Sequence, residues 1–93
     1  MVKESEEIKE KFTKAANEIK ANSELKLDSD TLLTLYGYYK QSLEGDCNTE
    51  APGFLDFKGK AKWEAWNKLK GLSNEDAMKK YYKKVKKILE VKK

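Results

Sequence analysis

Tyrosines and a lysine recur at helical spacing in residues 36–42, a combination that suits a ligand with a flat ring and phosphates. In a helix, Tyr36, Tyr39 and Lys40 share one face, because residues three and four positions apart are neighbours on the helix surface. Aromatic rings can stack on a base, and a lysine can donate charge-assisted hydrogen bonds to phosphate. The alternative interpretation is an amphipathic helix whose tyrosines are buried and whose lysine is solvated.

A second stretch, residues 58–66, repeats this combination of basic and aromatic side chains. Lys58 and Lys62 are one helical turn apart. We expect Trp66 to lie in the core and Trp63, which directly follows Lys62, to form a ligand-facing wall. An acyl chain could lie on these tryptophans and on neighbouring leucines. Two amphipathic helices with core aromatics and solvated lysines would give the same pattern.

The sequence offers little for catalysis or for metal binding. It contains no histidine, which excludes nucleophiles activated by histidine and metal sites built on it, and one cysteine cannot form a structural zinc site. Gly59-Lys60 suggests a phosphate-binding loop, but that motif needs glycine where Phe54 stands and serine or threonine where Ala61 stands. We therefore predict a protein that is not an enzyme, with no catalytic residue, no metal and no cofactor.

Length and composition predict one domain spanning residues 1–93, with a real but thin core. Charged residues make up 39% of the chain, which is typical of small, exposed helices. Cys47 is the only cysteine, so no intrachain disulfide can form, as is usual in a reducing compartment. No apolar run resembles a signal peptide or a membrane span. We expect a soluble, monomeric, cytoplasmic protein.

Charge is distributed unevenly along the chain. Residues 1–57 carry 7 lysines against 12 acidic residues, a net charge of −5, whereas residues 58–93 carry 13 lysines against 4, a net charge of +9. The lysine-rich segment 79–87 could therefore bind nucleic acid or an anionic membrane. All twenty basic residues are lysine, which argues against base-specific reading by bidentate arginine. The alternative is a solvated helix face, in which Tyr81 is an inward residue that could reach a cleft.

Apolar periodicity predicts four helices at about residues 5–21, 29–43, 58–70 and 74–91, and no strand. Suitable N-cap residues stand at their starts: Ser5, Asp28 or Ser29, Asp56 and Ser73. Gly71 is a suitable stop for the third helix. Four helices with mostly short links imply an all-α four-helix bundle.

The apolar stripes also predict packing. We expect the two terminal helices to meet through Phe12, Ala16 and Ile19 on one side and Tyr82, Val85 and Leu89 on the other. The loop of residues 45–57 contains Phe54, Leu55 and Phe57, which should pack it against the protein. Gly37 weakens its helix by up to ~1 kcal/mol. It either allows close approach of another group or is incidental.

Aromatic, basic and turn residues stand at fixed spacings over nearly the whole chain, from about Phe12 to Leu89. They are Tyr36-x-x-Tyr39-Lys40-Gln41, Gly45, Pro52-Gly53, Asp56, Lys58, Lys60-x-Lys62-Trp63-x-Ala65-Trp66, Gly71 and Ala77-x-x-x-Tyr81. This pattern resembles the acyl-CoA-binding protein family. The resemblance is specific, because many positions agree rather than one short motif.

The resemblance implies an up-down-down-up bundle with a long connection between the second and third helices. It also implies non-covalent binding of medium- to long-chain acyl-CoA esters, without catalysis, by an intracellular carrier and pool buffer. The ligand residues that it implies are Lys20, Tyr36, Tyr39, Lys40, Lys58, Lys62 and Tyr81, with Leu32, Leu33 and Trp63 lining the acyl path. Tyr39 would stack on the adenine, while Tyr36, Lys40 and Lys62 would hold the 3′-phosphate region. Other partners would be transient contacts with a membrane or an acyl-CoA-using enzyme, and nucleic acid is not expected.

Three positions depart from the family pattern. Ala51 stands where a basic residue is often seen, and Cys47 stands where an aliphatic residue is frequent. The loop after the first helix is about one residue longer, which affects the assignment of Lys20 most. None of these departures removes a headgroup residue. The alternative from another class is a basic helical module that binds nucleic acid or anionic membranes through its lysine-rich C-terminal helix.

Overall fold

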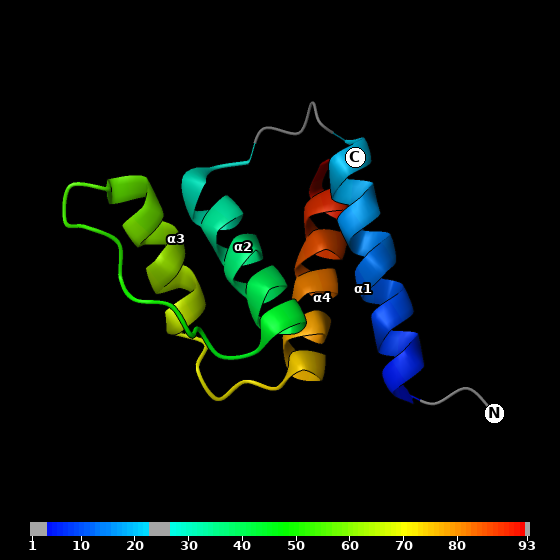
Figure 1. Cartoon of the computed structure of the whole chain (residues 1–93). Helices are drawn as coiled ribbons and strands as arrows, with labels where there is room; N and C mark the ends of the chain where they lie inside the picture. Colours follow the sequence, from blue (N-terminus) through cyan, green and yellow to red (C-terminus); the bar gives the residue numbers. More distant parts are fainter. Residues whose placement is uncertain (1–3, 23–26, 93) are drawn as a thin grey trace.

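Four helices make up the part of the chain that the computed structural model describes, residues 4–22 and 27–92. They are α1 (Glu4–Ala21), α2 (Ser29–Glu44), α3 (Phe57–Asn67) and α4 (Asn74–Lys92) (Figure 1). The prediction of an all-α protein with four helices is confirmed, and each predicted range overlaps an observed helix. Within the described residues, no helix combines the length and the apolar character needed to cross a bilayer.

Short polar side chains begin three of the helices, as the sequence predicts. Oδ1 of Asp28 accepts a hydrogen bond from the backbone N–H of Thr31 (2.7 Å), which caps α2. Asp56 accepts from the N–H three residues later (3.0 Å) at the start of α3. Ser73 Oγ likewise accepts from the N–H of Asp76 (3.1 Å) at the start of α4. Such caps satisfy backbone donors that have no partner inside the helix.

Two helix boundaries differ from the prediction. α1 begins at Glu4, so Ser5 lies inside its first turn and the prediction that Ser5 is the N-cap is wrong. α3 ends at Asn67, three residues earlier than expected, and the chain continues in tighter turns such as the 3.0 Å bond donated by Leu69 N–H. Gly71 ends these turns at φ = 93°, a backbone conformation that favours glycine.

The helices follow an up-down-down-up order and pack in a row (Figure 1). α1 packs against α4, α4 against α2, and α2 against α3, so α2 is the only helix among the described residues that α3 contacts. The fold is correspondingly flat, with extents of 47 × 32 × 16 Å. Because α2 and α3 run in the same direction, residues 45–56 have to return the length of a helix before α3 begins, and they do so beside α3 (Figure 1).

The core lies where α4 packs between α1 and α2. Its buried side chains are Ile8, Phe12, Ala15, Leu35, Met78, Tyr81 and Val85. Ala16, Ile19, Tyr82 and Leu89 pack around these residues, so the predicted contact between the terminal helices is confirmed. The rings of Phe12 and Tyr81 meet edge to face with their centres 5.0 Å apart, a favourable arrangement for an aromatic pair.

The connection between α2 and α3 does not bury its apolar residues. Phe54, Leu55 and Phe57 are 77%, 73% and 74% exposed, so the prediction that they pack against the protein is wrong. The backbone N–H of Asp56 donates to the carbonyl of Gly53 (2.9 Å), and this turn places Phe54 and Leu55 at its two corners. Phe57 begins α3 on a side that α2 does not cover.

Two tryptophans of α3 hold the connection through polar contacts instead. The indole N–H of Trp63 donates to the backbone carbonyl of Thr49 (2.8 Å). The indole N–H of Trp66 donates to the carbonyl of Gly45 (2.8 Å). These bonds tie the connection to α3 at two points. The donor and the acceptor are fourteen residues apart in sequence in the first bond and twenty-one in the second.

α2 and α3 approach each other closely at Gly37. A Cβ atom on Gly37 would overlap the backbone carbonyl of Ala65 and lie 3.3 Å from Cδ1 of Leu69. Only a residue without a side chain permits two helix backbones to come this near. Of the two interpretations of Gly37, close approach is therefore the one that the structure supports.

A polar network joins the end of α2 to the link between α3 and α4. The buried side chain of Gln41 donates through Nε2 to Asp46 Oδ1 (2.9 Å) and to the carbonyl of Leu72 (2.8 Å). The same Asp46 oxygen accepts from Gly71 N–H (2.8 Å), and Asn74 Nδ2 donates to the carbonyl of Gln41 (3.1 Å). The bonds from Gly71 and Gln41 hold the pKa of Asp46 below its usual value, because they favour the carboxylate form.

Replacing Phe12 by alanine should lower the free energy of unfolding by ~3–5 kcal/mol, because removal of the buried ring leaves a cavity beside Tyr81. Urea denaturation followed by circular dichroism measures this change. Thr13→Ala, at the exposed neighbouring position, is the matched control and should change stability by less than about 0.5 kcal/mol. Equal stability of the two variants would contradict the assignment of Phe12 to the core.

Gly37→Ala should destabilise the protein by about 1–3 kcal/mol, although alanine is the better helix former by ~1 kcal/mol. The added methyl group has to push α3 away from α2 at Ala65. Asn17→Ala, at an exposed position of α1, changes helix propensity without a steric clash and should be neutral or slightly stabilising. If thermal denaturation showed the Gly37→Ala variant to be more stable than the wild type, the two helices could not be in contact at this point.

Candidate ligand-binding site

The two aromatic and basic stretches meet across the contact between α2 and α3. Nζ of Lys62 on α3 lies 5.6 Å from the centre of the Tyr36 ring on α2. The close approach at Gly37, the next residue along α2, brings these side chains within reach of each other. Lys62 is exposed, and among the described residues no carboxylate forms an ion pair with it. An ammonium group held over a ring keeps its hydrogens available for a phosphate.

A second ammonium group lies one turn further along α2. Nζ of Lys40 is 4.9 Å from the centre of the Trp66 ring and forms an ion pair with Glu44. The hydrogen bond to Glu44 raises the pKa of Lys40, which keeps the ammonium charged. Trp66 is buried, as predicted, but the sequence did not indicate that its ring also supports Lys40.

Tyr39 connects this region to the core. Its ring centre lies 5.6 Å from that of Phe12 and 5.9 Å from that of Tyr81. Tyr81 is only 5% exposed, which confirms its predicted inward position; burial, and then the nearby Tyr39, raises the pKa of Tyr81, so its hydroxyl stays protonated. A half-buried ring such as Tyr39, supported by two others, is a rigid platform on which a base can stack.

Lys58 and Lys20 are both exposed. Among the described residues, neither ammonium group lies over an aromatic ring or forms an ion pair. Lys58 lies one turn before Lys62 on α3, so the two ammonium groups can reach the same ligand. Lys20 lies in the last turn of α1, which packs against α4 and not against α3.

The three residues predicted to line an acyl path have different surroundings. Leu32 is half exposed and lies one turn before Tyr36 on the same face of α2. Leu33 is half-buried in a shallow groove between α2 and α3. Trp63 is half-buried, and its indole is fixed by the bond to the connection described above. Leu32 therefore offers open apolar surface beside Tyr36, whereas Leu33 and Trp63 lie at the edges of the helix contact.

Several residues that position the site had no predicted role. Gln41 belongs to the pattern that resembles the family, but the sequence assigned no role to Gln41, Asp46 or Asn74. Together these three residues fix the end of α2 against the α3–α4 link. One signal was available for Gln41. It lies one turn after Gly37 on the side of α2 that faces α3, and a polar residue at an inward position needs hydrogen-bond partners.

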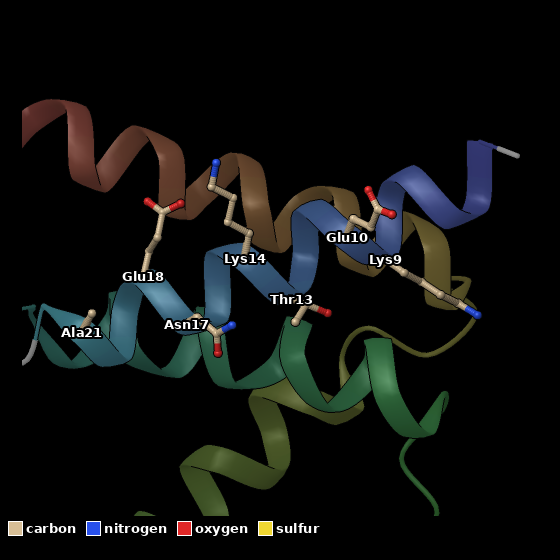
Figure 2. A pocket seen from close by; sticks show the side chains of 7 residues that line it. All are labelled: Lys9, Glu10, Thr13, Lys14, Asn17, Glu18 and Ala21. Atoms are coloured by element: carbon tan, nitrogen blue, oxygen red, sulfur yellow. The ribbon is translucent and has the colours of Figure 1, made fainter. Parts of the chain in front are cut away.

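A separate depression, with a volume of about 620 Å³, runs along the outer face of α1. Figure 2 shows that its side chains spread along this one helix instead of converging on a point. The lining residues are Lys9, Glu10, Thr13, Lys14, Asn17, Glu18 and Ala21. None of them is a predicted ligand residue, none has a ring, and the two lysines are offset by two glutamates. This surface therefore lacks the groups that would hold an anionic aromatic ligand.

We use the name α2–α3 site for Tyr36, Tyr39, Lys40 and Lys62. It combines two ammonium groups, each over an aromatic face, with a third ring backed by the core. Stacking and charge-assisted hydrogen bonds are the interactions that these groups can make. The arrangement is suited to holding a ring with phosphates.

Known proteins resemble this chain in sequence and in fold. The family model described as acyl CoA binding protein matches residues 9–85. Acyl-CoA-binding protein 2 of Oryza sativa is 37% identical, covers 91% of this chain and 93% of its own, and superposes with a TM-score of 0.84. ACBP from Moniliophthora perniciosa is 41% identical, covers 89% of this chain and 81% of its own, and has a TM-score of 0.83. The acyl CoA binding protein of Babesia bovis T2Bo is 36% identical, covers 88% of this chain and 93% of its own, and has a TM-score of 0.78.

These matches extend over most of the chain, and residues 9–85 include every predicted ligand residue from Lys20 to Tyr81. The similar solved structures share the all-α fold at sequence identities that exceed one third. Membership of this family supports acyl-CoA binding. By sequence and by structure, the chain belongs to the acyl-CoA-binding protein family.

Proposed function

We propose that this chain, as a single domain, reversibly binds medium- to long-chain acyl-CoA esters and acts as their carrier and pool buffer. It does so as a cytoplasmic monomer and catalyses no reaction on the ester. Family membership supports acyl-CoA binding. The observation that carries the proposal is the placement of Lys62 over Tyr36 and Lys40 over Trp66, beside the ring of Tyr39. CoA presents a base, a separate phosphate and a pyrophosphate, which need such groups.

In the proposed complex, the headgroup lies on the α2–α3 site. Stacking of the adenine on Tyr39 contributes ~1–3 kcal/mol. Tyr36, Lys40 and Lys62 hold the 3′-phosphate region, and each charge-assisted hydrogen bond contributes ~1.5–3 kcal/mol. Lys40 then exchanges its ion pair with Glu44 for a phosphate oxygen. Lys20, Lys58 and Tyr81 complete the headgroup site.

The acyl chain follows Leu32, Leu33 and Trp63. Each methylene that leaves water contributes ~0.8 kcal/mol, so the affinity depends on how many of them the protein covers. Leu32 supports this path, because its apolar surface is half exposed next to Tyr36. The acyl path therefore lies on α2 and α3, the two helices that carry the α2–α3 site.

Lys62→Ala should weaken palmitoyl-CoA binding by about tenfold to a hundredfold, the equivalent of one charge-assisted hydrogen bond to phosphate. Its free energy of unfolding should barely change, because Lys62 is exposed. Titration calorimetry and denaturation measure the two quantities. Lys14→Ala is the matched control, because this exposed lysine lies on the outer face of α1, and α1 does not contact α3 among the described residues. Wild-type affinity in Lys62→Ala would mean that the headgroup lies elsewhere.

Calorimetry should rank the ligands with palmitoyl-CoA far above CoA, and CoA above palmitate. Palmitate lacks the base and the phosphates, and CoA leaves the acyl path uncovered. Two added methylenes should contribute ~1.6 kcal/mol, about tenfold in affinity, until the path is filled.

Three other outcomes would contradict this ranking. Equal affinity for palmitate and palmitoyl-CoA would indicate a general lipid binder. Equal affinity for CoA and palmitoyl-CoA would show that Leu32, Leu33 and Trp63 do not contact the chain. Binding of nucleic acid through α4 that exceeds palmitoyl-CoA binding, and that falls steeply with salt, would favour the basic-module alternative.

A further inference from the structure

A segment of four residues exposes three large apolar side chains to solvent: Phe54, Leu55 and Phe57. We call them the apolar tip. A single exposed leucine is common on a protein surface, but two phenylalanines and a leucine gathered on one segment of a small domain indicate an interaction site. None of the three belongs to the core cluster or to the α2–α3 site, so neither folding nor the proposed ligand accounts for their exposure.

The apolar tip is presented by an anchored segment. The bond from Asp56 N–H to the carbonyl of Gly53 (2.9 Å) closes a turn with Phe54 and Leu55 at its corners. The carboxylate of Asp56 caps α3, which fixes the turn to the helix that follows. The indole of Trp63 holds the same connection at Thr49. Little conformational entropy is therefore lost when the tip meets a partner.

The position of the tip allows a flat surface to approach it. α3 contacts α2 but neither α1 nor α4 among the described residues. Figure 1 shows α3 and the connection before it along one edge of the molecule, on the far side of α2 from α1 and α4. Phe54 and Leu55 touch little of their own protein and form a convex corner. A convex apolar corner suits insertion into a deformable partner.

The positive charge around the tip favours an anionic partner. Residues 57–71, which form α3 and the turns after it, carry five lysines against one glutamate. Lys58 and Lys60 follow the tip directly, and both are exposed. The nearest carboxylate, Asp56, is engaged at the start of α3; Glu50 lies further back in the connection. Apolar side chains with lysines at their base match the boundary between acyl chains and anionic headgroups.

We propose that the apolar tip, flanked by Lys58 and Lys60, is a docking surface for anionic lipid bilayers. Phe54, Leu55 and Phe57 enter the boundary between headgroups and acyl chains, while the two lysines face the anionic headgroups. This surface is separate from the lysine-rich segment 79–87 of α4. The docking does not depend on a bound ester, but it brings the α2–α3 site close to the bilayer, since Lys62 lies on α3, the helix that begins at Phe57 of the tip.

The test measures binding of the full chain to vesicles of phosphatidylcholine with phosphatidylserine, and to vesicles of phosphatidylcholine alone, by flotation. The wild type should bind the anionic vesicles and bind the neutral ones more weakly. The double variant Phe54→Asn, Leu55→Asn should lose binding by at least about tenfold, because two inserted apolar side chains are removed. Leu43→Asn, at another exposed leucine, is the matched control and should bind as the wild type does.

Two further variants locate the contact. Lys60→Glu should weaken binding to anionic vesicles more than Lys83→Glu on α4 does, although each reverses one exposed charge. In a Phe54→Trp variant, the added fluorescence should shift to shorter wavelength on anionic vesicles and be quenched by brominated lipid. Circular dichroism and titration with palmitoyl-CoA in the absence of vesicles should leave the double variant indistinguishable from the wild type, which keeps this test separate from that of the proposed ligand.

Four results would overturn the docking surface. They are wild-type vesicle binding in the double variant, no vesicle binding by the wild type, a greater loss from Lys83→Glu than from Lys60→Glu, and loss of palmitoyl-CoA affinity in the double variant without vesicles. If the wild type did not bind vesicles, a protein pocket would be left as the partner of the tip. A greater loss from Lys83→Glu would move the membrane contact to α4. Loss of palmitoyl-CoA affinity in the double variant would place Phe54 and Leu55 on the acyl path.

Discussion

The close approach of α2 and α3 at Gly37 is the constraint on which the rest of the site depends. α3 packs on α2 alone among the described helices, so every group that α3 contributes is positioned by this one contact. With no side chain at Gly37, the backbone of α3 at Ala65 comes close enough for Lys62 to reach the ring of Tyr36. A bulkier residue would widen the gap and separate the ammonium group from the aromatic face. The glycine weakens α2 locally, yet it allows the contact that builds the site.

The same contact requires support at its ends, because two helices that run in one direction need a long connection. That connection is held by hydrogen bonds rather than by apolar packing. The two indoles of α3 bind its backbone, and Asp46 bridges Gln41 and the backbone of Gly71. Hydrogen bonds of defined geometry fix distance and orientation, whereas apolar packing is not directional. The apolar side chains of the connection are consequently left free to face solvent.

Core and site share aromatic rings. Phe12 of α1, Tyr39 of α2 and Tyr81 of α4 lie within 6 Å of one another, centre to centre, and of the three only Tyr39 is not fully buried. The packing of the terminal helices therefore supports the ring on which we propose that the base stacks. Close packing keeps such a ring in one orientation, so the site is formed largely before a ligand arrives.

The sequence by itself determined the helices, three of their caps and the faces that are apolar, because these depend on neighbours three or four residues away. It also placed Trp66 and Phe12 in the core and Tyr81 on an inward face correctly. Family resemblance added the order of the helices, which periodicity cannot specify. Only the tertiary structure decided which surface covers each apolar face. It left Phe54 and Leu55 exposed, placed Lys40 on Trp66 and gave Gln41 its partners. Those outcomes depend on residues up to thirty-three positions apart, whose distance in space no local pattern encodes.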